Sequence, residues 1–252
     1  MVAEICGLKT EYTVQGNGKD VLFLHGWGSS YAVYTSMMAA LADNCRCTAL
    51  NFPGCGASEV MKEPFTIEDY ANFVLEFIKF AKLETPVLVG HSHGGRVILY
   101  MVTHSLINPP KIVLLDSAGL IPKKSLKQKL RAKSFKTVKK VLTVPVWKNK
   151  TENLLEKARR HYGSADYNAA PPVLRKTLVN VVNVDLRDRL DKIKCPTLLI
   201  WGDKDTATPL ADAEIMESRI SDCGLCIIKN TGHFSFCEKP YEANAIIKSF
   251  LG

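Results

Sequence analysis

Apolar residues follow two alternating patterns along this chain of 252 residues. Short continuous apolar runs are typical of strands buried in a parallel sheet, whereas apolar residues that recur every three or four positions are typical of one face of a helix. The runs that predict strands are KDVLFLHG (19–26), CRCTALNF (45–52), PVLVG (86–90), KIVLLD (111–116), CPTLLIWG (195–202) and GLCIIKN (224–230). The segments with the helical pattern are 31–43, 66–83, 95–105, 210–220 and 241–251. This alternation predicts an α/β domain with a largely parallel sheet.

The alternation stops after the strand-like run that ends at Asp116. Residues 117–190 hold Lys-rich stretches with the helical pattern and no strong strand pattern, and the strand-like runs resume after them. We therefore predict that residues 117–190 form an inserted, all-helical cap. The core domain would then consist of two parts, 1–116 and 191–252.

The positive charge of the chain is concentrated in the predicted cap. The formal net charge is +8, and residues 121–162 alone contribute +12, because fourteen Lys and Arg side chains are accompanied by only two Glu. Such an uneven distribution indicates an inserted region with its own surface chemistry and argues against nucleic acid as the partner. We interpret the basic run as the solvated face of amphipathic helices. The alternative is a surface that attracts an anionic substrate or makes peripheral contact with an anionic layer.

Hydropathy and cysteine usage bear on the compartment. No apolar run approaches the roughly 18 residues of a membrane span, and the N-terminus lacks the apolar region of a signal peptide, so we expect a cytoplasmic protein without a transmembrane segment. Eight cysteines are scattered along the chain, which favours reduced thiols. The pairs Cys45/Cys47 and Cys223/Cys226 lie in strand-like runs, where we expect small packed side chains rather than zinc ligands.

The stretch LVGHSHGGR (88–96) contains the motif G-x-S-x-G at Gly90–Gly94. An apolar strand pattern comes directly before it and an apolar helix pattern directly after it, which is the setting of a nucleophile elbow. In such a turn the serine backbone adopts a rarely allowed conformation that points its Oγ outward. Side chains at Gly90 and Gly94 would collide with the neighbouring strand and helix. The motif therefore predicts that Ser92 is a nucleophile.

Other interpretations of this Gly- and His-rich stretch fit less well. A phosphate-binding loop requires G-x-x-x-x-G-K-[ST] and a dinucleotide site requires G-x-G-x-x-G, and neither pattern is present. His91 and His93 are two positions apart at a turn and could share a metal ion only by distorting it. We therefore expect no cofactor and no metal.

Four further motifs make the chain resemble the α/β-hydrolase family over nearly its whole length. HGW (25–27), NFPGCGAS (51–58), WGDKD (201–205) and TGHFSF (231–236) stand in the family's order. The resemblance implies an eight-stranded, mostly parallel sheet with a helical cap inserted after the sixth strand, where the insertion lies. Because the N-terminus is short, we expect the sheet to be slightly truncated at its first antiparallel strands.

A serine hydroxyl is a weak nucleophile near neutral pH and needs a base, which in turn needs an orienting acid. The resemblance implies His233 as the base, in a Gly-containing loop after a strand. It implies Asp205 as the acid, so that Ser92, Asp205 and His233 follow in the family's order. Asp203 in the same loop and Asp116 after the sixth predicted strand are the alternative acids.

The negative oxygen of a tetrahedral intermediate needs hydrogen-bond donors, usually two backbone N–H groups. One should come from His93, the residue after the nucleophile at the positive end of its helix. The resemblance implies that the other comes from Trp27, which follows His-Gly in the family's oxyanion loop. The side chain of His93 would then be secondary to its backbone.

These features predict a serine hydrolase that cleaves a small carboxylic ester or thioester, neutral or anionic, through an acyl-enzyme intermediate. The serine at the elbow argues against the epoxide and halide chemistries of family members that carry aspartate there. Two alternatives stay open: a hydrolase of carbon–carbon bonds in a carboxylate-bearing substrate, and a ligand-sensing protein with little turnover.

Overall fold

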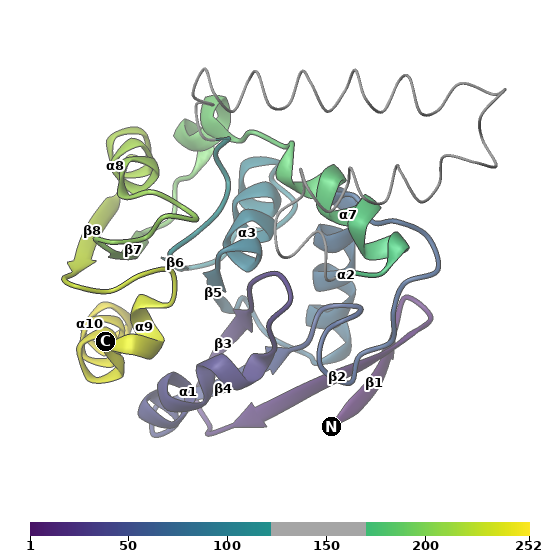
Figure 1. Cartoon of the computed structure of the whole chain (residues 1–252). Coiled ribbons are helices and arrows are strands. Elements are labelled where there is room, and N and C mark those ends of the chain that lie inside the picture. The colour runs from purple at the N-terminus through teal and green to yellow at the C-terminus, as the bar shows by residue number, and fades with distance from the viewer. Residues whose placement is uncertain (122–169) are drawn as a thin grey trace, which may run out of the picture.

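The strands predicted from the apolar runs lie side by side in one sheet of the computed structural model, which describes residues 1–121 and 170–252 (Figure 1). The eight strands run in the order β1-β2-β4-β3-β5-β6-β7-β8. Their bounds are β1 Val2–Ile5, β2 Leu8–Gln15, β3 Lys19–Leu24, β4 Cys45–Leu50, β5 Val87–His91, β6 Ile112–Leu115, β7 Thr197–Gly202 and β8 Cys223–Ile228. From β4 to β8 every neighbouring pair is parallel. The predicted eight-stranded, mostly parallel sheet is confirmed.

The expected truncation at the N-terminus is wrong. β1 and β2 pair with each other antiparallel, and β2 pairs antiparallel with β4, so the antiparallel part of the sheet is present. Cys6 and Gly7 form the two-residue turn between β1 and β2, with φ of 52° and 73°. Two successive positive φ angles give the turn a twist that matches the flanking strands. A four-residue strand and a tight hairpin fit into the short N-terminal segment.

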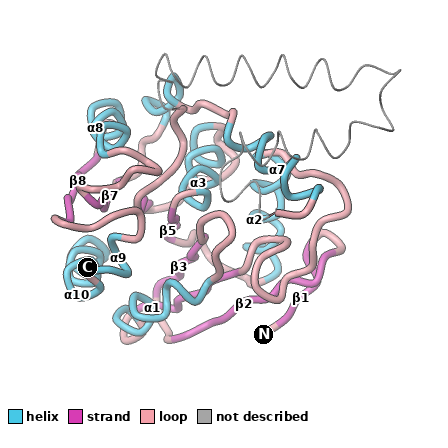
Figure 2. Tube along the Cα trace, viewed as in Figure 1, coloured by secondary structure: helices cyan, strands magenta, loops and turns pink. Residues whose placement is uncertain are grey.

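Helices cover both faces of the sheet (Figure 2). The main helices are α1 Thr35–Leu41, α2 Ile67–Phe80, α3 His93–Thr103, α8 Leu210–Arg219 and α10 Pro240–Leu251, with a short α9 at Ser235–Glu238 and a 3-10 helix η1 at Tyr31–Tyr34. Buried side chains of α2, α3 and α8 form one hydrophobic cluster with the sheet, and those of α1, α9 and α10 form a second cluster. The result is a three-layer arrangement in which the ends of the parallel strands stay accessible to loops.

Helix α2 illustrates how the local sequence sets these bounds. Thr66 caps its N-terminus by accepting a hydrogen bond from the backbone of Asp69, whose side chain in turn accepts one from the Thr66 backbone. This capping box satisfies N–H groups that have no partner inside the helix. The buried face of α2 then packs into the first cluster.

The structure describes only part of the predicted cap. Within residues 117–190, the described part contains helix α7 (Pro172–Val182), and the 3-10 helix η3 (Arg187–Lys192) crosses the predicted boundary at 190. The backbone N–H of Phe65 donates to Thr177 Oγ1 on α7 over 3.0 Å. Residues 122–169, which hold nearly all of the basic run, lie outside the described residues. The division into 1–116, 117–190 and 191–252 therefore stays a prediction.

Candidate active site

The chain turns sharply at Ser92, between β5 and α3. Its φ of 48° and ψ of −111° lie where residues other than glycine are rare, and such strain persists only when the surroundings enforce it. A Cβ atom at Gly94 would lie 1.9 Å from the carbonyl oxygen of Leu24, and one at Gly90 would lie 2.6 Å from the amide nitrogen of Gly95. As expected from the sequence, both glycines are needed for α3 to approach the sheet this closely.

The side chains of Ser92, His233 and Asp205 form a chain of hydrogen bonds. Nε2 of His233 lies 3.0 Å from Ser92 Oγ, and Nδ1 lies 2.8 Å from Asp205 Oδ2. Because a carboxylate oxygen only accepts, Nδ1 carries the hydrogen, and Nε2 is left to accept the hydroxyl hydrogen of Ser92. This is the geometry in which an imidazole can take up the proton of a serine.

Asp205 is stabilised in its charged form. Burial acts to raise its pKa, but hydrogen bonds from His233 and Thr208 outweigh burial and hold the pKa below its ordinary value. Asp203, two residues earlier, turns away from His233 and accepts a hydrogen bond from the backbone N–H of Asn230 over 2.7 Å. Of the two aspartates in this loop, Asp205 is the one that contacts the imidazole.

Asp116, the other alternative acid, accepts hydrogen bonds from backbone N–H groups and from a serine hydroxyl, and not from the His233 imidazole. Its fully buried carboxylate accepts hydrogen bonds from the Gly202 N–H at 2.8 Å, the Ser235 N–H at 3.1 Å and the Ser235 hydroxyl at 2.6 Å. Burial raises the pKa of Asp116 to about 6, although these hydrogen bonds oppose the shift. Asp116 therefore ties the end of β7 to the start of α9, shortly after His233.

Trp27 and His93 lie next to each other at the elbow, with their ring centroids 5.7 Å apart. Among the described residues, no acceptor pairs with the backbone N–H of either one. For His93 the reason is its place as the first residue of α3, since first-turn N–H groups have no partner inside a helix. The same helix end carries partial positive charge. Both features suit an oxygen that becomes negative beside Ser92.

A family model described as the alpha/beta hydrolase family matches residues 21–245 of the chain. The chain belongs to the alpha/beta hydrolase family. A pimeloyl-[acyl-carrier protein] methyl ester esterase of Aeromonas hydrophila is 26% identical over 249 residues, which cover 94% of this chain and 97% of that protein. The AB hydrolase superfamily protein YisY of Bacillus subtilis is 27% identical and is covered to 92%.

Solved structures agree with this assignment at the level of the fold. The enol-lactonase from Burkholderia xenovorans LB400 superposes with a TM-score of 0.76 at 20% identity, covering 100% of this chain and 99% of that one. A hydrolase from Pseudomonas aeruginosa gives a TM-score of 0.77 at 22% identity. The predicted family, and with it the prediction of a hydrolase, is confirmed.

In this alpha/beta hydrolase, His25 is a buried structural group. Its Nδ1 donates to the Gly26 carbonyl at 2.7 Å, and its Nε2 accepts from the Phe52 N–H at 3.0 Å, which requires a neutral ring. Burial lowers the pKa of His25 to about 4. The ring thereby joins the loop that carries Trp27 to the loop that begins at Asn51.

No sequence pattern considered above points to Thr208, which contacts both Asp205 and His233. Its hydroxyl donates to Asp205 Oδ2 at 2.6 Å and lies 3.2 Å from His233 Nδ1. The backbone N–H groups of Ala207 and Thr208 donate to Asp205 Oδ1. An aspartate followed three residues later by threonine is typical of a turn closed by side-chain hydrogen bonds. This local spacing is the signal that would have identified Thr208.

Arg96 lies one helical turn beyond Ser92 and is almost completely buried. It donates to the carbonyl oxygen of Val184, in the segment between α7 and η3. Burial lowers the pKa of Arg96 to about 10, and the nearby carboxylates of Asp185 and Asp212 oppose this shift. The guanidinium therefore connects α3 to the segment between α7 and η3.

The described residues hold no candidate metal cluster and no helix able to span a membrane. Within residues 1–121 and 170–252, no three His, Cys, Asp or Glu side chains are arranged to hold a metal ion. All eight cysteines are free thiols, and Cys45 and Cys47 pack in the buried core. No helix in the described part of the chain has the length and apolarity needed to cross a membrane.

Proposed function

We propose that this protein hydrolyses small carboxylic esters through an acyl-enzyme formed on Ser92. The observation that carries the proposal is the hydrogen-bonded order Ser92 Oγ, His233 Nε2, His233 Nδ1 and Asp205 Oδ2, with distances of 3.0 and 2.8 Å. Two comparisons also support ester chemistry: a relative named as a methyl ester esterase and a structural neighbour named as an enol-lactonase.

In the first half of the reaction, Ser92 Oγ attacks the ester carbonyl carbon while His233 Nε2 takes the hydroxyl proton. The carbonyl oxygen becomes negative, and the backbone N–H groups of Trp27 and His93 donate hydrogen bonds to it. Loss of one such donor in a serine hydrolase typically costs about 3 kcal/mol of transition-state stabilisation. Asp205 keeps Nδ1 protonated and stabilises the imidazolium. The C–O bond to the alcohol then breaks, and His233 returns the proton to the departing oxygen.

In the second half, water replaces the alcohol. His233 Nε2 removes a proton from the water as its oxygen attacks the acyl carbon, and the same two N–H groups hold the negative oxygen. The bond to Ser92 Oγ breaks, Oγ regains the proton, and the carboxylic acid leaves. A thioester would follow the same steps with a thiol in place of the alcohol, its sulfur taking the proton that His233 returns, so the arrangement accommodates both bonds.

Turnover of p-nitrophenyl acetate and butyrate by Ser92→Ala and by Ser218→Ala tests the proposal. Ser218 is a matched control, because its one hydrogen bond within residues 1–121 and 170–252 is to the Ile215 carbonyl on α8. We expect Ser92→Ala to lower kcat on the order of 10⁴-fold or more, and Ser218→Ala to leave it unchanged. Undiminished turnover by Ser92→Ala would exclude this mechanism. Release of one p-nitrophenolate per wild-type chain without further turnover would indicate the ligand-sensing alternative.

A further inference from the structure

His91 is a second buried histidine that reaches the site. It is the last residue of β5, directly before Ser92, and only 1% of it is exposed. Its Nε2 lies 2.8 Å from the backbone carbonyl oxygen of His233. Because a carbonyl oxygen only accepts, Nε2 carries the hydrogen. The residue before the candidate nucleophile therefore holds the backbone of the candidate base across 142 positions of sequence.

The other nitrogen of the His91 ring makes no comparable contact. Among the described residues, Nδ1 has no hydrogen-bond partner. The Gly26 backbone lies so close that a Cβ atom there would be 2.7 Å from Nδ1. Burial and then the neighbouring His233 lower the pKa of His91 to about 3, so the ring stays neutral at ordinary pH. The bond to His233 is thus the one polar contact described for this ring.

The loop around His233 is held at several points, and His91 is the one that links it to the nucleophile strand. Before His233, the N–H of Gly232 donates to Glu238 Oε1 at 2.9 Å. After it, Ser235 is bonded to Asp116. The imidazole itself rotates about bonds that begin at the His233 Cα, so the position of its Nε2 depends on how the backbone of that residue is fixed.

Aromatic packing surrounds the same contact. The His91 ring lies 4.8 Å from the His233 ring, 4.6 Å from Phe234 and 5.1 Å from Phe236, measured between centroids. Packing alone would be served equally well by a phenylalanine at position 91. A histidine adds one directional hydrogen bond, and that bond is made to the backbone of the candidate base.

We propose that His91 is a positioning residue, which acts through the His233 carbonyl to hold the imidazole at bonding distance from Ser92. The inference rests on the proposed function. His91 neither touches substrate nor exchanges a proton in the reaction. It keeps the elbow and the base loop in register, because β5 carries both the nucleophile and the donor that fixes the base.

Two substitutions separate the hydrogen bond from the packing. His91→Phe keeps a ring of similar size and removes the donor. His91→Gln keeps an N–H at about the reach of Nε2. A misplacement of reacting groups by about 1 Å can cost on the order of 100-fold in rate, so we expect His91→Phe to lower kcat by roughly 10- to 100-fold with KM within about twofold of wild type. His91→Gln should recover most of the lost kcat.

Both variants are assayed for kcat and KM on p-nitrophenyl butyrate, with Tm measured alongside. Equal kcat for His91→Phe and wild type, or an equal loss in both variants, would overturn the inference and leave His91 as a packing residue. If His91→Phe does not fold, His91→Asn replaces it, because its N–H lies where Nδ1 was and cannot reach the carbonyl. We then expect a low kcat for His91→Asn and a kcat near wild type for His91→Gln. Loss of activity in Ser92→Ala together with unchanged His91 variants would reject this inference and leave the proposed function standing.

Discussion

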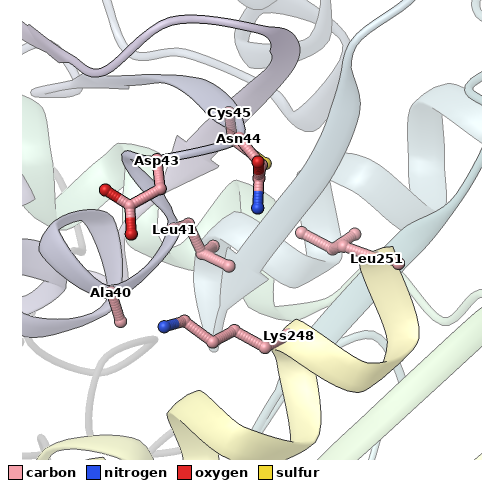
Figure 3. A pocket seen from close by; sticks show the side chains of 8 residues that line it. Ala40, Leu41, Asp43, Asn44, Cys45, Lys248 and Leu251 are labelled. Carbon is pink, nitrogen blue, oxygen red and sulfur yellow. The ribbon is translucent and has the colours of Figure 1, made fainter.

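The two ends of the parallel strands differ in how their polar groups are arranged. At the carboxyl ends, the side chains of Ser92, His233 and Asp205, which follow β5, β8 and β7, are joined by hydrogen bonds in that order. At the amino ends lies a hollow of about 140 Å³ between the end of α1, the start of β4 and the end of α10 (Figure 3). It is lined by Ala40, Leu41, Asp43, Asn44, Cys45, Lys248, Leu251 and Gly252.

The hollow contains charged side chains, but the described residues around it form no hydrogen-bonded chain between these side chains. Asp43 and Lys248 are both exposed, and within the described residues neither makes a hydrogen bond or ion pair through its side chain. Exposed charges are screened by water and keep their freedom of rotation. Asp205, by contrast, is buried and fixed by Thr208 and His233. A concave surface is therefore weaker evidence for catalysis than a chain of hydrogen bonds in which every donor and acceptor is assigned.

The largest expected effect comes from breaking that chain at its acid. In Asp205→Asn the amide can donate to Nδ1 of His233, which favours the tautomer that cannot take the proton from Ser92. Loss of the correct tautomer in a serine triad lowers kcat on the order of 10⁴-fold, and we expect a similar loss in the turnover of p-nitrophenyl butyrate. Asp203→Asn is the matched control in the same loop and should stay within about twofold of wild type. Comparable losses in both variants would point to a loop that is merely disturbed.

A second test uses the pH dependence of stability to probe His93, a buried histidine at the carboxyl ends of the strands. Burial, followed by the charge of Arg96, lowers the pKa of His93 to about 3, from 6.5 in the unfolded chain. The unfolded state therefore binds a proton between these values that the folded state does not. The stability that follows is present above pH 6.5 and is lost as the pH falls towards 3, by about 5 kcal/mol for a shift of this size.

His93→Phe should remove this acid sensitivity. Its ring would pack among Trp27, Phe52 and Tyr70, as the imidazole does. The free energies of unfolding of variant and wild type are measured with denaturant at pH 7 and at pH 4.5. Their difference should shift by about 2 to 3 kcal/mol in favour of the variant at the lower pH. Because the backbone N–H at position 93 is kept, we expect kcat to fall far less than the 10²- to 10³-fold typical of a lost oxyanion donor. An unchanged slope of stability against pH would contradict the burial of a neutral imidazole here.

The parts of this picture that the sequence predicts are those encoded locally. The apolar runs identify the inner strands, and the elbow is predicted from Gly90 and Gly94 because a strand and a helix flank them directly. Asp205 and His233 required the family resemblance, because spacing alone cannot bring together residues 28 positions apart. The β1–β2 hairpin is harder to predict, because β1 has only four residues, too few to show a period of two.

Other features depend on contacts that no local pattern encodes. The bond from His91 to the His233 carbonyl joins residues 142 positions apart, and no pattern in the sequence around either one indicates the other. The role of Asp116 is of the same kind: an aspartate after a strand can face an imidazole or a backbone N–H, and only the packing of β7 and α9 decides for the backbone. Burial and partner choice are properties of the folded chain, so periodicity predicts elements better than it predicts the hydrogen bonds between them.

We expect the smallest effect on stability and turnover from a substitution at the amino-end hollow. Lys248→Ala removes the long side chain that Figure 3 shows extending from α10 along the hollow. An exposed lysine without a fixed partner contributes little, so the free energy of unfolding should change by no more than about 0.5 kcal/mol. Turnover of p-nitrophenyl butyrate should equal that of wild type, because the variant leaves every group at the carboxyl ends in place. A severalfold loss of kcat without a loss of stability would show that the amino-end hollow takes part in function, and that an ordered chain of hydrogen bonds alone does not distinguish the two ends.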